Sequence, residues 1–453
     1  MGLGDVVQFY VVAIVGLRWL ATAAAAGPSA LVVWLIAAVA LFVPLALAVI
    51  ELSARHPDEG GIYVWSRVAF GDFTGFIVAW LYWVSNVVYA PGLLYFMAGN
   101  ALFMGGADWQ TLSNQPSFYI VVSLVGIVIA VGLNVVGLEI GKRLHNLGAW
   151  STWIPVAVLV AMGAWALARF GSATRFDSAA LVPSTRLTDL YFWSTIAFAF
   201  GGFEAASLMG EEIRDARRAV PRAVLIAGLA IAAIYMLGTA AILVALPGQQ
   251  VSGLQGIMQA IQQVAERVGV PGVTPVVAAL VAIGALGGTA AWLAATARLI
   301  FVTGVDRYLP PVFGRLHPRW KTPVWALVAQ AIGAALFAVL GQAGASVRGA
   351  YDFLVSMGVI TYFIPFLVMF AALIKLQREP LPAGAVRLPG GQATTMVLAG
   401  LGIATVTISI VLAVFPPGEG GGGAVKILLA SALVVAMGIG VYVRGRRRVA
   451  ANP

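Results

Sequence analysis

Long runs of apolar residues, separated by short polar gaps, follow one another along almost the whole chain. A helix that crosses a membrane needs roughly 20 apolar residues, and about twelve runs meet that length. They cover residues 6–26, 31–51, 74–103, 118–137, 150–168, 191–210, 222–246, 273–303, 323–341, 351–376, 395–415 and 424–443. The short alternating segments of a membrane β-barrel are missing from the sequence. The pattern therefore predicts an all-α polytopic membrane protein with about 12 transmembrane helices.

The composition agrees with this prediction. The 453 residues are 61% hydrophobic and 10% charged, with a mean hydropathy of +0.94, whereas soluble proteins carry about 25% charged residues. No polar segment is long enough for a separate soluble domain, so we expect residues 1–453 to form a single membrane domain. The amino end lacks the basic segment and cleavage site of a signal peptide, which predicts that the first helix is retained.

The basic residues separate into two groups when the loops are assigned alternately to the two sides of the membrane. With the amino terminus in the cytoplasm, Lys and Arg favour the cytoplasmic side by roughly three to one, the bias typical of inner or plasma membranes. The sparse side holds Arg169, Arg175, Arg186, Arg267, Arg348 and Lys426. This bias predicts that both termini are cytoplasmic. Because the net charge of +9 is not gathered in one patch, we do not expect nucleic acid as a partner. The expected partners are the lipid bilayer and a small-molecule substrate. The protein is expected to be a monomer or a homodimer.

Two of the apolar runs contain features that interrupt a helix. Gly16 to Trp19 lie in the first run, and "FAFGGFEAAS", residues 198–207, lies in the sixth. Glycine costs about 1 kcal/mol relative to alanine in a helix, and each interruption carries an ionisable residue. Interrupted helices at matching positions of two halves indicate an inverted-repeat transporter with its binding site near the midplane. The alternative is that these glycines serve close helix packing.

Four stretches resemble the amino acid–polyamine–organocation superfamily of permeases. They are "AAAAGPSALVVW" (23–34), "ELSARHPDEGGIYVWSRVAFGDFTGFIVAW" (51–80), "AFAFGGFEAASLMGEEIRDARRAVPRAV" (197–224) and "ARLIFVTGVDRYLPPVFGRLHPRWKTPVWA" (297–326). The resemblance implies the five-plus-five inverted-repeat fold shared with sodium-coupled leucine transporters, with helices 1 and 6 broken. The first repeat would span about 6–168 and the second about 191–376, followed by two extra helices at about 395–443. It also implies transport of amino acids or related amines.

The sequence departs from this family at two places. The family usually has a Gly-Ser/Thr-Gly loop in helix 1, whose amides hold the substrate carboxylate, but "AIVGLRWL" (13–20) has one Gly and no Ser or Thr. Spacing back from Gly27 aligns residues 13–17 with that loop, and residues 16–19 are an alternative with one gap. The Lys that replaces a sodium ion in helix 5 of many proton-coupled relatives is also missing, because Thr152 and Trp153 stand near its place.

Arg18 is the first candidate for chemistry. An arginine at the centre of a membrane helix costs about 2.5–3.5 kcal/mol on insertion scales, so intramembrane charges are functional candidates. If helix 1 began at Trp19, Arg18 would reach the interface, but that helix would be too short to span. We expect a buried Arg18 that supplies the positive charge missing from helix 5, holding either Glu204 or the substrate carboxylate.

Glu204, beside the predicted break in helix 6, is the second candidate. It is expected to titrate or to gate, and the alternative is a carboxylate that points to solvent at a helix end. Phe198 and Phe203 flank it and could cover the substrate or bind its ammonium group by a cation–π contact, although packing is as good a reading. Gly201 and Gly202 are assigned to the unwound backbone.

Three further polar residues complete the predicted site. Asn86 and Tyr89 in helix 3 could line it, although hydrogen bonds between helices are the commoner role for such groups. Thr289 in helix 8 falls where the family often has a bulky residue that contacts the substrate, and its hydroxyl could also coordinate a sodium ion. The full set of expected substrate-binding residues is Ile14, Val15, Gly16, Leu17, Arg18, Trp19, Asn86, Tyr89, Phe198, Gly201, Gly202, Phe203, Glu204 and Thr289, with Arg18 and Glu204 also in gating or coupling. No metal site is expected, because all three histidines lie in predicted loops.

These features predict a secondary active transporter for an amino acid or related amine that works by alternating access, either as an antiporter or as a proton or sodium symporter. No phosphate-binding loop for ATP is present, and no nucleophile–base pair or metal cluster of an intramembrane enzyme. We expect neither a cofactor nor an enzymatic activity. The alternatives are a membrane nutrient sensor that binds without translocating, and a permease for polyamines or other organocations.

Overall fold

The computed structural model describes ten stretches of the chain. They are residues 2–56, 60–136, 138–205, 207, 213, 216–305, 308–342, 346–380, 390–416 and 420–451. Within these stretches all regular structure is helical, and no strand occurs. The predicted all-helical fold is therefore confirmed.

Ten helical segments of the described chain are long and apolar enough to cross a membrane, and each coincides with a predicted run. The first combines α3 (Ala30–Ala37) and α4 (Val43–Arg55). The others are α6 (Asp72–Ala101), α8 (Pro116–Val136), α9 (Leu138–Phe170), α11 (Ala216–Ala245), α13 (Val273–Val305), α14 (Val324–Gly341), α15 (Val347–Leu376), α16 (Gly391–Ala413) and α17 (Gly420–Ala451). The protein is therefore a multi-pass membrane protein.

The two remaining predicted runs contain shorter helices. Run 6–26 is divided into α1 (Leu3–Ile14) and α2 (Leu17–Ala25), and run 191–210 contains α10 (Leu187–Phe198). Residues 206 and 208–210 of the second run lie outside the described chain. Three short helices, α5 (Ile62–Phe70), α7 (Gly106–Gln110) and α12 (Gly256–Val268), connect the long ones.

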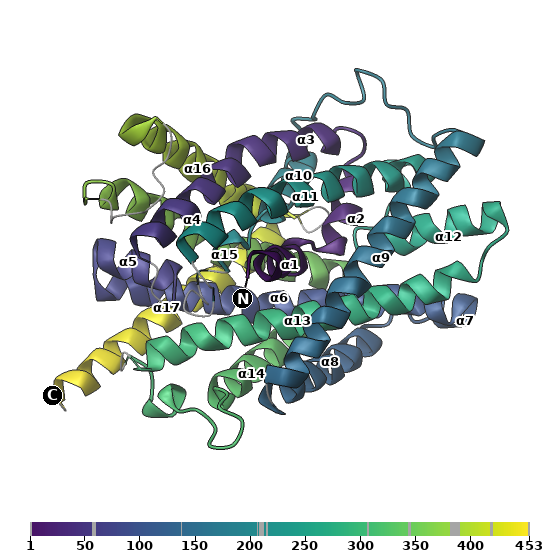
Figure 1. Cartoon of the computed structure of the whole chain (residues 1–453). Helices are drawn as coiled ribbons and strands as arrows, with labels where there is room; N and C mark the ends of the chain where they lie inside the picture. The colour runs from purple at the N-terminus through teal and green to yellow at the C-terminus, as the bar shows by residue number, and fades with distance from the viewer. Residues whose placement is uncertain are drawn as a thin grey trace.

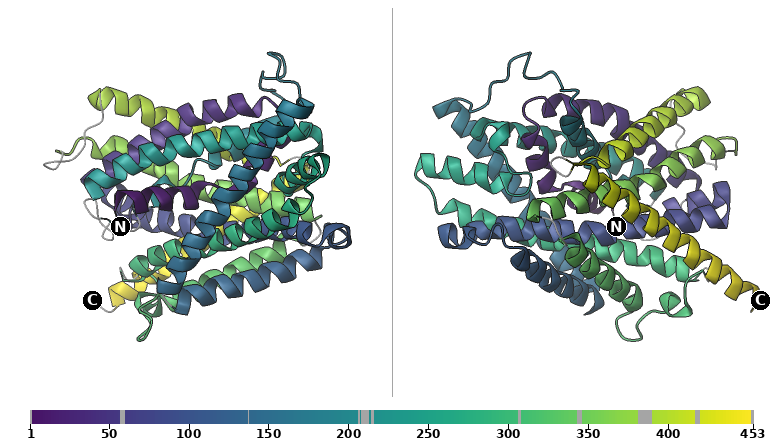
Figure 2. Two further views of the ribbon diagram at one scale, coloured as in Figure 1. Left: turned by 45° about the vertical axis from the view of Figure 1, so that its right-hand side comes forward. Right: turned by 180° about the vertical axis from the view of Figure 1, so that it is seen from behind.

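The long helices surround α1 and α6, which lie in the middle of the molecule. Figure 1 shows α1 at the centre, and it contacts α11, α9 and α13. Helix α6 packs along α13 and α15, and most of its side chains are buried. In Figure 2, α9 crosses the other helices obliquely. Helices α1, α2 and α10 are therefore enclosed by longer ones.

The outer faces of the peripheral helices are apolar. Val397 of α16 is 70% exposed and Leu429 of α17 is 67% exposed, and similar large apolar side chains cover α14. Soluble monomers rarely expose patches of this kind. Lipid chains are the environment that suits them.

Helix α3 continues into α4 through a wide, π-helical turn at residues 38–42. Pro44, at the start of α4, has no amide hydrogen to donate to the carbonyl group of Ala40. The hydroxyl of Thr405, on α16, donates to that carbonyl at 3.0 Å. The extra helix α16 thus provides a hydrogen-bond donor to a backbone carbonyl in the turn before the proline.

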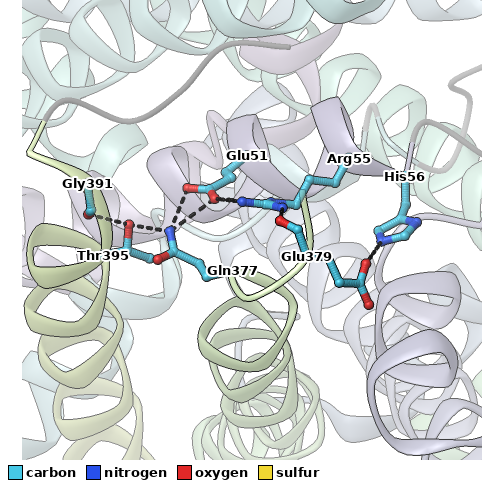
Figure 3. Close-up of polar contacts among 7 residues, drawn as sticks. All are labelled: Glu51, Arg55, His56, Gln377, Glu379, Gly391 and Thr395. Atoms are coloured by element: carbon cyan, nitrogen blue, oxygen red, sulfur yellow. Dashed lines mark hydrogen bonds and ion pairs between the residues drawn. The ribbon is translucent and has the colours of Figure 1, made fainter. Parts of the chain in front are cut away.

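A buried polar network joins one end of α4 to α15 and α16 (Figure 3). The Glu51 carboxylate accepts two hydrogen bonds from Arg55, at 3.1 and 2.8 Å. Gln377 donates to both oxygens of Glu51, at 3.0 and 3.1 Å, and to Thr395 at 2.6 Å. Arg55 also donates to the backbone carbonyl of Glu379 at 2.8 Å. Both charged side chains of the pair therefore have their hydrogen-bonding groups engaged.

Replacing Glu51 with alanine is predicted to destabilise the protein. The side chains of Arg55 and Glu51 are only 6% and 2% exposed, so removal of the carboxylate leaves an uncompensated buried cation. Such a loss costs about 3–5 kcal/mol of unfolding free energy, and the melting temperature of the purified protein should fall clearly. The matched control is Glu379→Gln, because that side chain is 51% exposed. Equal melting temperatures for the two variants would contradict the prediction.

Candidate functional site

Helix 1 is interrupted at Val15 and Gly16. Helix α1 ends at Ile14, Gly16 has extended backbone angles, and α2 begins at Leu17 without a side-chain cap. The interruption matches the alignment at residues 13–17 rather than the one at 16–19. Arg18 and Trp19 consequently lie in the first turn of α2 and not in unwound backbone, which corrects that part of the sequence prediction.

The chain also leaves the helix after Phe198. Residues 199–202 form a turn, and residues 203–205 a 3₁₀ turn. Gly202 has a φ of +118°, a region that L side chains rarely adopt. A Cβ atom on Gly202 would also lie 2.7 Å from the side chain of Ile14. This glycine lets the turn pass close to the end of α1.

The hydroxyl group of Tyr235, on α11, connects the interruption of helix 1 to the turn after α10. The hydroxyl lies 2.6 Å from the Ile14 carbonyl and 3.0 Å from the Ala199 carbonyl, and it accepts from the Gly16 amide at 3.3 Å. A phenol has one hydrogen, so it donates to one carbonyl at a time. One buried side chain thus serves backbone groups that both breaks leave free.

Trp292 on α13 provides a second such contact. Its indole N–H donates to the Ala13 carbonyl at 2.9 Å. Irregular backbone at membrane depth is tolerated where it is buried in protein or lines a cavity. Tyr235 and Trp292 are the protein side chains that form hydrogen bonds with this irregular backbone.

Two small cavities lie beside the breaks, and we call them the central cavities. The first, of about 20 Å³, is lined by Ile14, Trp19, Asn86, Tyr89, Phe198 and Gly201 among the predicted residues. The second, of about 30 Å³, is lined by Val15, Gly16, Leu17 and again Tyr89. Cavities of this size hold water-sized molecules. An amino acid requires that they widen.

A larger cavity of about 300 Å³ lies nearer one end of the molecule, and we call it the outer cavity. It extends from exposed residues such as Arg348 to buried ones such as Tyr191, Tyr351 and Val355. Its volume falls within the range of small-molecule sites. Its lining comes from loops and from the ends of several helices.

Glu204 is fully buried. One carboxylate oxygen accepts hydrogen bonds from Tyr82, at 2.7 Å, and from Tyr362, and the other accepts from the Gly202 amide at 3.2 Å. Tyr362 also lines the first central cavity. The alternative of a Glu204 side chain in solvent is excluded, and the three donors compensate the cost of burying the carboxylate.

Arg18 is also buried, with 2% of its surface exposed. Its Cζ atom lies 4.1 Å from the centre of the Trp19 ring and 4.2 Å from that of Tyr89. Among the described residues, no ion pair joins Arg18 to Glu204. The Glu204 carboxylate accepts hydrogen bonds from Tyr82 and Tyr362 instead. Of the two partners expected for Arg18, the structure does not pair it with Glu204, because hydroxyl and amide donors occupy that carboxylate.

Two further predicted residues lie outside the cavity walls described above. Phe203 is fully buried and packs on the rings of Tyr10 and Phe42. The hydroxyl of Thr289 donates to the Ala285 carbonyl within its own helix at 2.9 Å. For Phe203 the packing alternative describes the contacts that the structure shows, and the Thr289 hydroxyl is occupied within its own helix.

Sequence reasoning missed Tyr82, Tyr235, Trp292 and Tyr362. Each is an aromatic residue with a polar group inside an apolar run, and such groups find hydrogen-bond partners when buried. That signal marks them as partners of something buried, but their partners are backbone groups and a carboxylate more than 100 residues away.

Comparison with known proteins decides the family. The model of the amino acid permease family matches residues 3–439. The chain belongs to that family. The superfamily resemblance found in the sequence is thereby confirmed, and with it the expectation of a membrane permease.

Relatives of this permease include several bacterial transporters. It is 29% identical to an uncharacterised transporter of Legionella pneumophila, over 92% of this chain and 89% of the relative. It is 31% identical to an uncharacterised transporter of Mycobacterium tuberculosis, over 76% of this chain and 72% of the relative. A probable agmatine/putrescine antiporter of Lactococcus lactis is 24% identical, over 87% of this chain and 84% of that protein.

Replacing Tyr235 with phenylalanine is predicted to lower the stability of this permease. The Ile14 or Ala199 carbonyl and the Gly16 amide then lose a partner, and each buried unsatisfied group costs about 1–3 kcal/mol. Melting temperatures of the purified variants measure the effect. The control is Tyr10→Phe, because the buried Tyr10 hydroxyl has no hydrogen-bond partner in the described chain. A Tyr235→Phe protein as stable as this control would refute the bridging role.

Proposed function

We propose that this permease is a secondary active transporter of an amino acid or related amine that works by alternating access. The observation that carries the proposal is that the interruption between α1 and α2 meets the end of α10 at the central cavities. Broken helices of this kind place a substrate site near the bilayer midplane in transporters. The predicted sensor, which binds without translocating, shares that geometry and is separated from a transporter by the assay below.

The order of features along two helices supports a transport path. On α15, Tyr351 lines the outer cavity and Tyr362 lines the first central cavity. These residues are separated by about 16 Å at the rise of an α-helix. On α6, Tyr89 and Asn86 line the central cavities, and Tyr82 follows about one turn beyond Asn86. The path thus runs from the outer cavity through the central cavities to the Tyr82–Glu204–Tyr362 cluster.

The Tyr82–Glu204–Tyr362 cluster is well placed to act as the gate at the far end of this path. It joins α6, the segment after α10 and α15 through two hydrogen bonds to one carboxylate oxygen. Hydrogen bonds to a charged group contribute about 1.5–3 kcal/mol each, more than those to a neutral one. Protonation of Glu204 would therefore weaken the contact and favour opening, which makes a proton a natural coupling ion.

The relatives add support for exchange. One is named as a probable agmatine/putrescine antiporter, and its likeness extends over most of both chains. We therefore propose antiport for this permease, with symport of a proton or sodium ion as the alternative. The bias of Lys and Arg supports a location in the cytoplasmic membrane with both termini in the cytoplasm. In that orientation the outer cavity faces away from the cytoplasm.

Counterflow in proteoliposomes tests the proposed function. Vesicles that contain the purified protein and an unlabelled amino acid or amine should accumulate the same labelled compound, because a transporter exchanges it across the membrane. Compounds that raise the melting temperature of the protein select the substrates to test. Binding without any counterflow would favour the sensor.

The gate is tested with Glu204→Gln. The neutral amide weakens the bonds to Tyr82 and Tyr362, so transport should lose most of its dependence on pH while remaining measurable. Initial rates of counterflow between pH 5 and 8 give the readout. Glu266→Gln is the control, because Glu266 is exposed on α12 and bonded only to Gln262 among the described residues. An unchanged pH profile in Glu204→Gln would contradict the gating role.

A further inference from the structure

The guanidinium group of Arg18 is a buried cation without an acceptor in the described chain. Its side chain is 2% exposed, and the Nε atom has no hydrogen-bond partner. No hydrogen bond or ion pair of the described residues involves the other guanidinium nitrogens. Buried charges in proteins are ordinarily paired with an opposite charge or held by hydrogen bonds. Arg18 therefore lacks a partner that its chemistry requires.

Two aromatic rings fix the orientation of this cation. The Trp19 and Tyr89 ring centres lie 4.1 and 4.2 Å from Cζ, so both rings contact the planar group. The N–H donors of a guanidinium lie in its plane. The cation–π contacts stabilise the charge but offer no hydrogen-bond acceptor, so these donors have none among the described residues. They are the part of Arg18 available to an acceptor.

Gly92 on α6 gives the guanidinium its room. A Cβ atom at this position would lie only 3.0 Å from the Nη1 atom of Arg18. A larger residue would therefore crowd the group. The backbone of α6 and the two rings hold the arginine in one place.

The surroundings of Arg18 connect the cavities. Tyr89, on which it stacks, lines both central cavities. Thr22, one turn after Arg18 on α2, lines the outer cavity, and its hydroxyl donates to the Arg18 carbonyl at 3.0 Å. Arg18 thus lies where the outer cavity approaches the central ones. The uncapped amino terminus of α2, at Gly16 and Leu17, adds a partial positive charge beside it.

A purely structural role does not explain this arrangement. An apolar side chain of similar size would fill the same space without the cost of burying a charge. The buried carboxylate of Glu204 is already bonded to Tyr82, Tyr362 and the Gly202 amide. Asp352, at the outer cavity, lies 3.7 Å from the Nε atom of Arg348. The missing partner is therefore an anion that comes from outside the chain.

We propose that Arg18 binds the carboxylate of the transported solute, so that the substrates are amino acids with a free carboxylate rather than polyamines. The inference rests on the proposed transport function and names its substrate class. The planar donors of arginine match the two oxygens of a carboxylate. In this permease the arginine replaces the family's Gly-Ser/Thr-Gly loop as the group that binds the carboxylate, because the residues around Gly16 include no serine or threonine.

Matched ligands test the substrate class directly. Melting temperatures of the wild-type protein are measured with each standard amino acid, and each stabilising compound is then compared with its methyl ester and with the amine that lacks the carboxyl group. For arginine and ornithine these amines are agmatine and putrescine. The acids should bind about 10- to 100-fold more tightly than either analogue, the range expected for a charge-assisted hydrogen bond. Stabilisation by agmatine or putrescine and by no amino acid would overturn the proposal.

Variants of Arg18 test the residue. Arg18→Ala should weaken binding of the acid by about 10- to 100-fold and remove the preference over the ester. Arg18→Lys should restore part of that preference, because it keeps the charge but not the planar pair of donors. Arg67→Lys is the control, since Arg67 also stacks on a tyrosine, 5.3 Å from the ring centre of Tyr63, away from the cavities. A monodisperse Arg18→Ala protein that keeps its affinity for the acid and its preference over the ester refutes the assignment.

The same preparations separate this inference from the proposed function. If the acids bind in an Arg18-dependent manner but no counterflow occurs, the carboxylate site stands and the transport function fails. If counterflow proceeds with equal acid and ester selectivity in wild type and Arg18→Ala, transport stands and the carboxylate site fails.

Discussion

Backbone groups inside a membrane must find partners within the protein, and this requirement shapes the centre of the permease. The breaks after Ile14 and Phe198 would each leave carbonyl and amide groups unpaired in lipid. The Tyr235 hydroxyl reaches the Ile14 and Ala199 carbonyls and the Gly16 amide. The ring of Trp34 stacks on Tyr235 with centres 4.4 Å apart, which holds the hydroxyl in place. The two breaks therefore depend on one another through one side chain.

The two charged residues of the site are treated differently by their surroundings. Glu204 receives hydrogen bonds from two tyrosines and one amide, so its charge is compensated by the protein itself. Arg18 receives two aromatic faces and no acceptor from the described chain. A carboxylate whose hydrogen-bond partners all come from the protein can hold a transport path closed. A guanidinium without an acceptor can instead bind a solute that supplies the acceptor. This difference is the basis for proposing Glu204 as a gating residue and Arg18 as a binding residue.

The sequence predicted the helical fold well, because apolar runs of membrane length depend only on local composition. It also located Arg18 and Glu204 as buried charges, since an ionisable residue inside such a run is conspicuous. Their partners could not be found in the same way. The choice between Glu204 and a solute as the partner of Arg18 depends on Tyr82 and Tyr362, which lie 122 and 158 residues from Glu204 along the chain. Contacts at that separation are set by helix packing, which no local pattern records.

The small size of the central cavities follows from the same packing. Trp19, Phe198 and Tyr362 meet edge to face, with ring centres 5.3 and 5.1 Å apart. These rings occupy the space that a solute would need, so binding must displace them. Phe198 lies at the end of α10 and Trp19 in the first turn of α2, next to the two interruptions. Displacement there can pivot about unwound backbone without breaking a regular helix. The irregular segments beside the proposed site are therefore also the natural hinges for its opening.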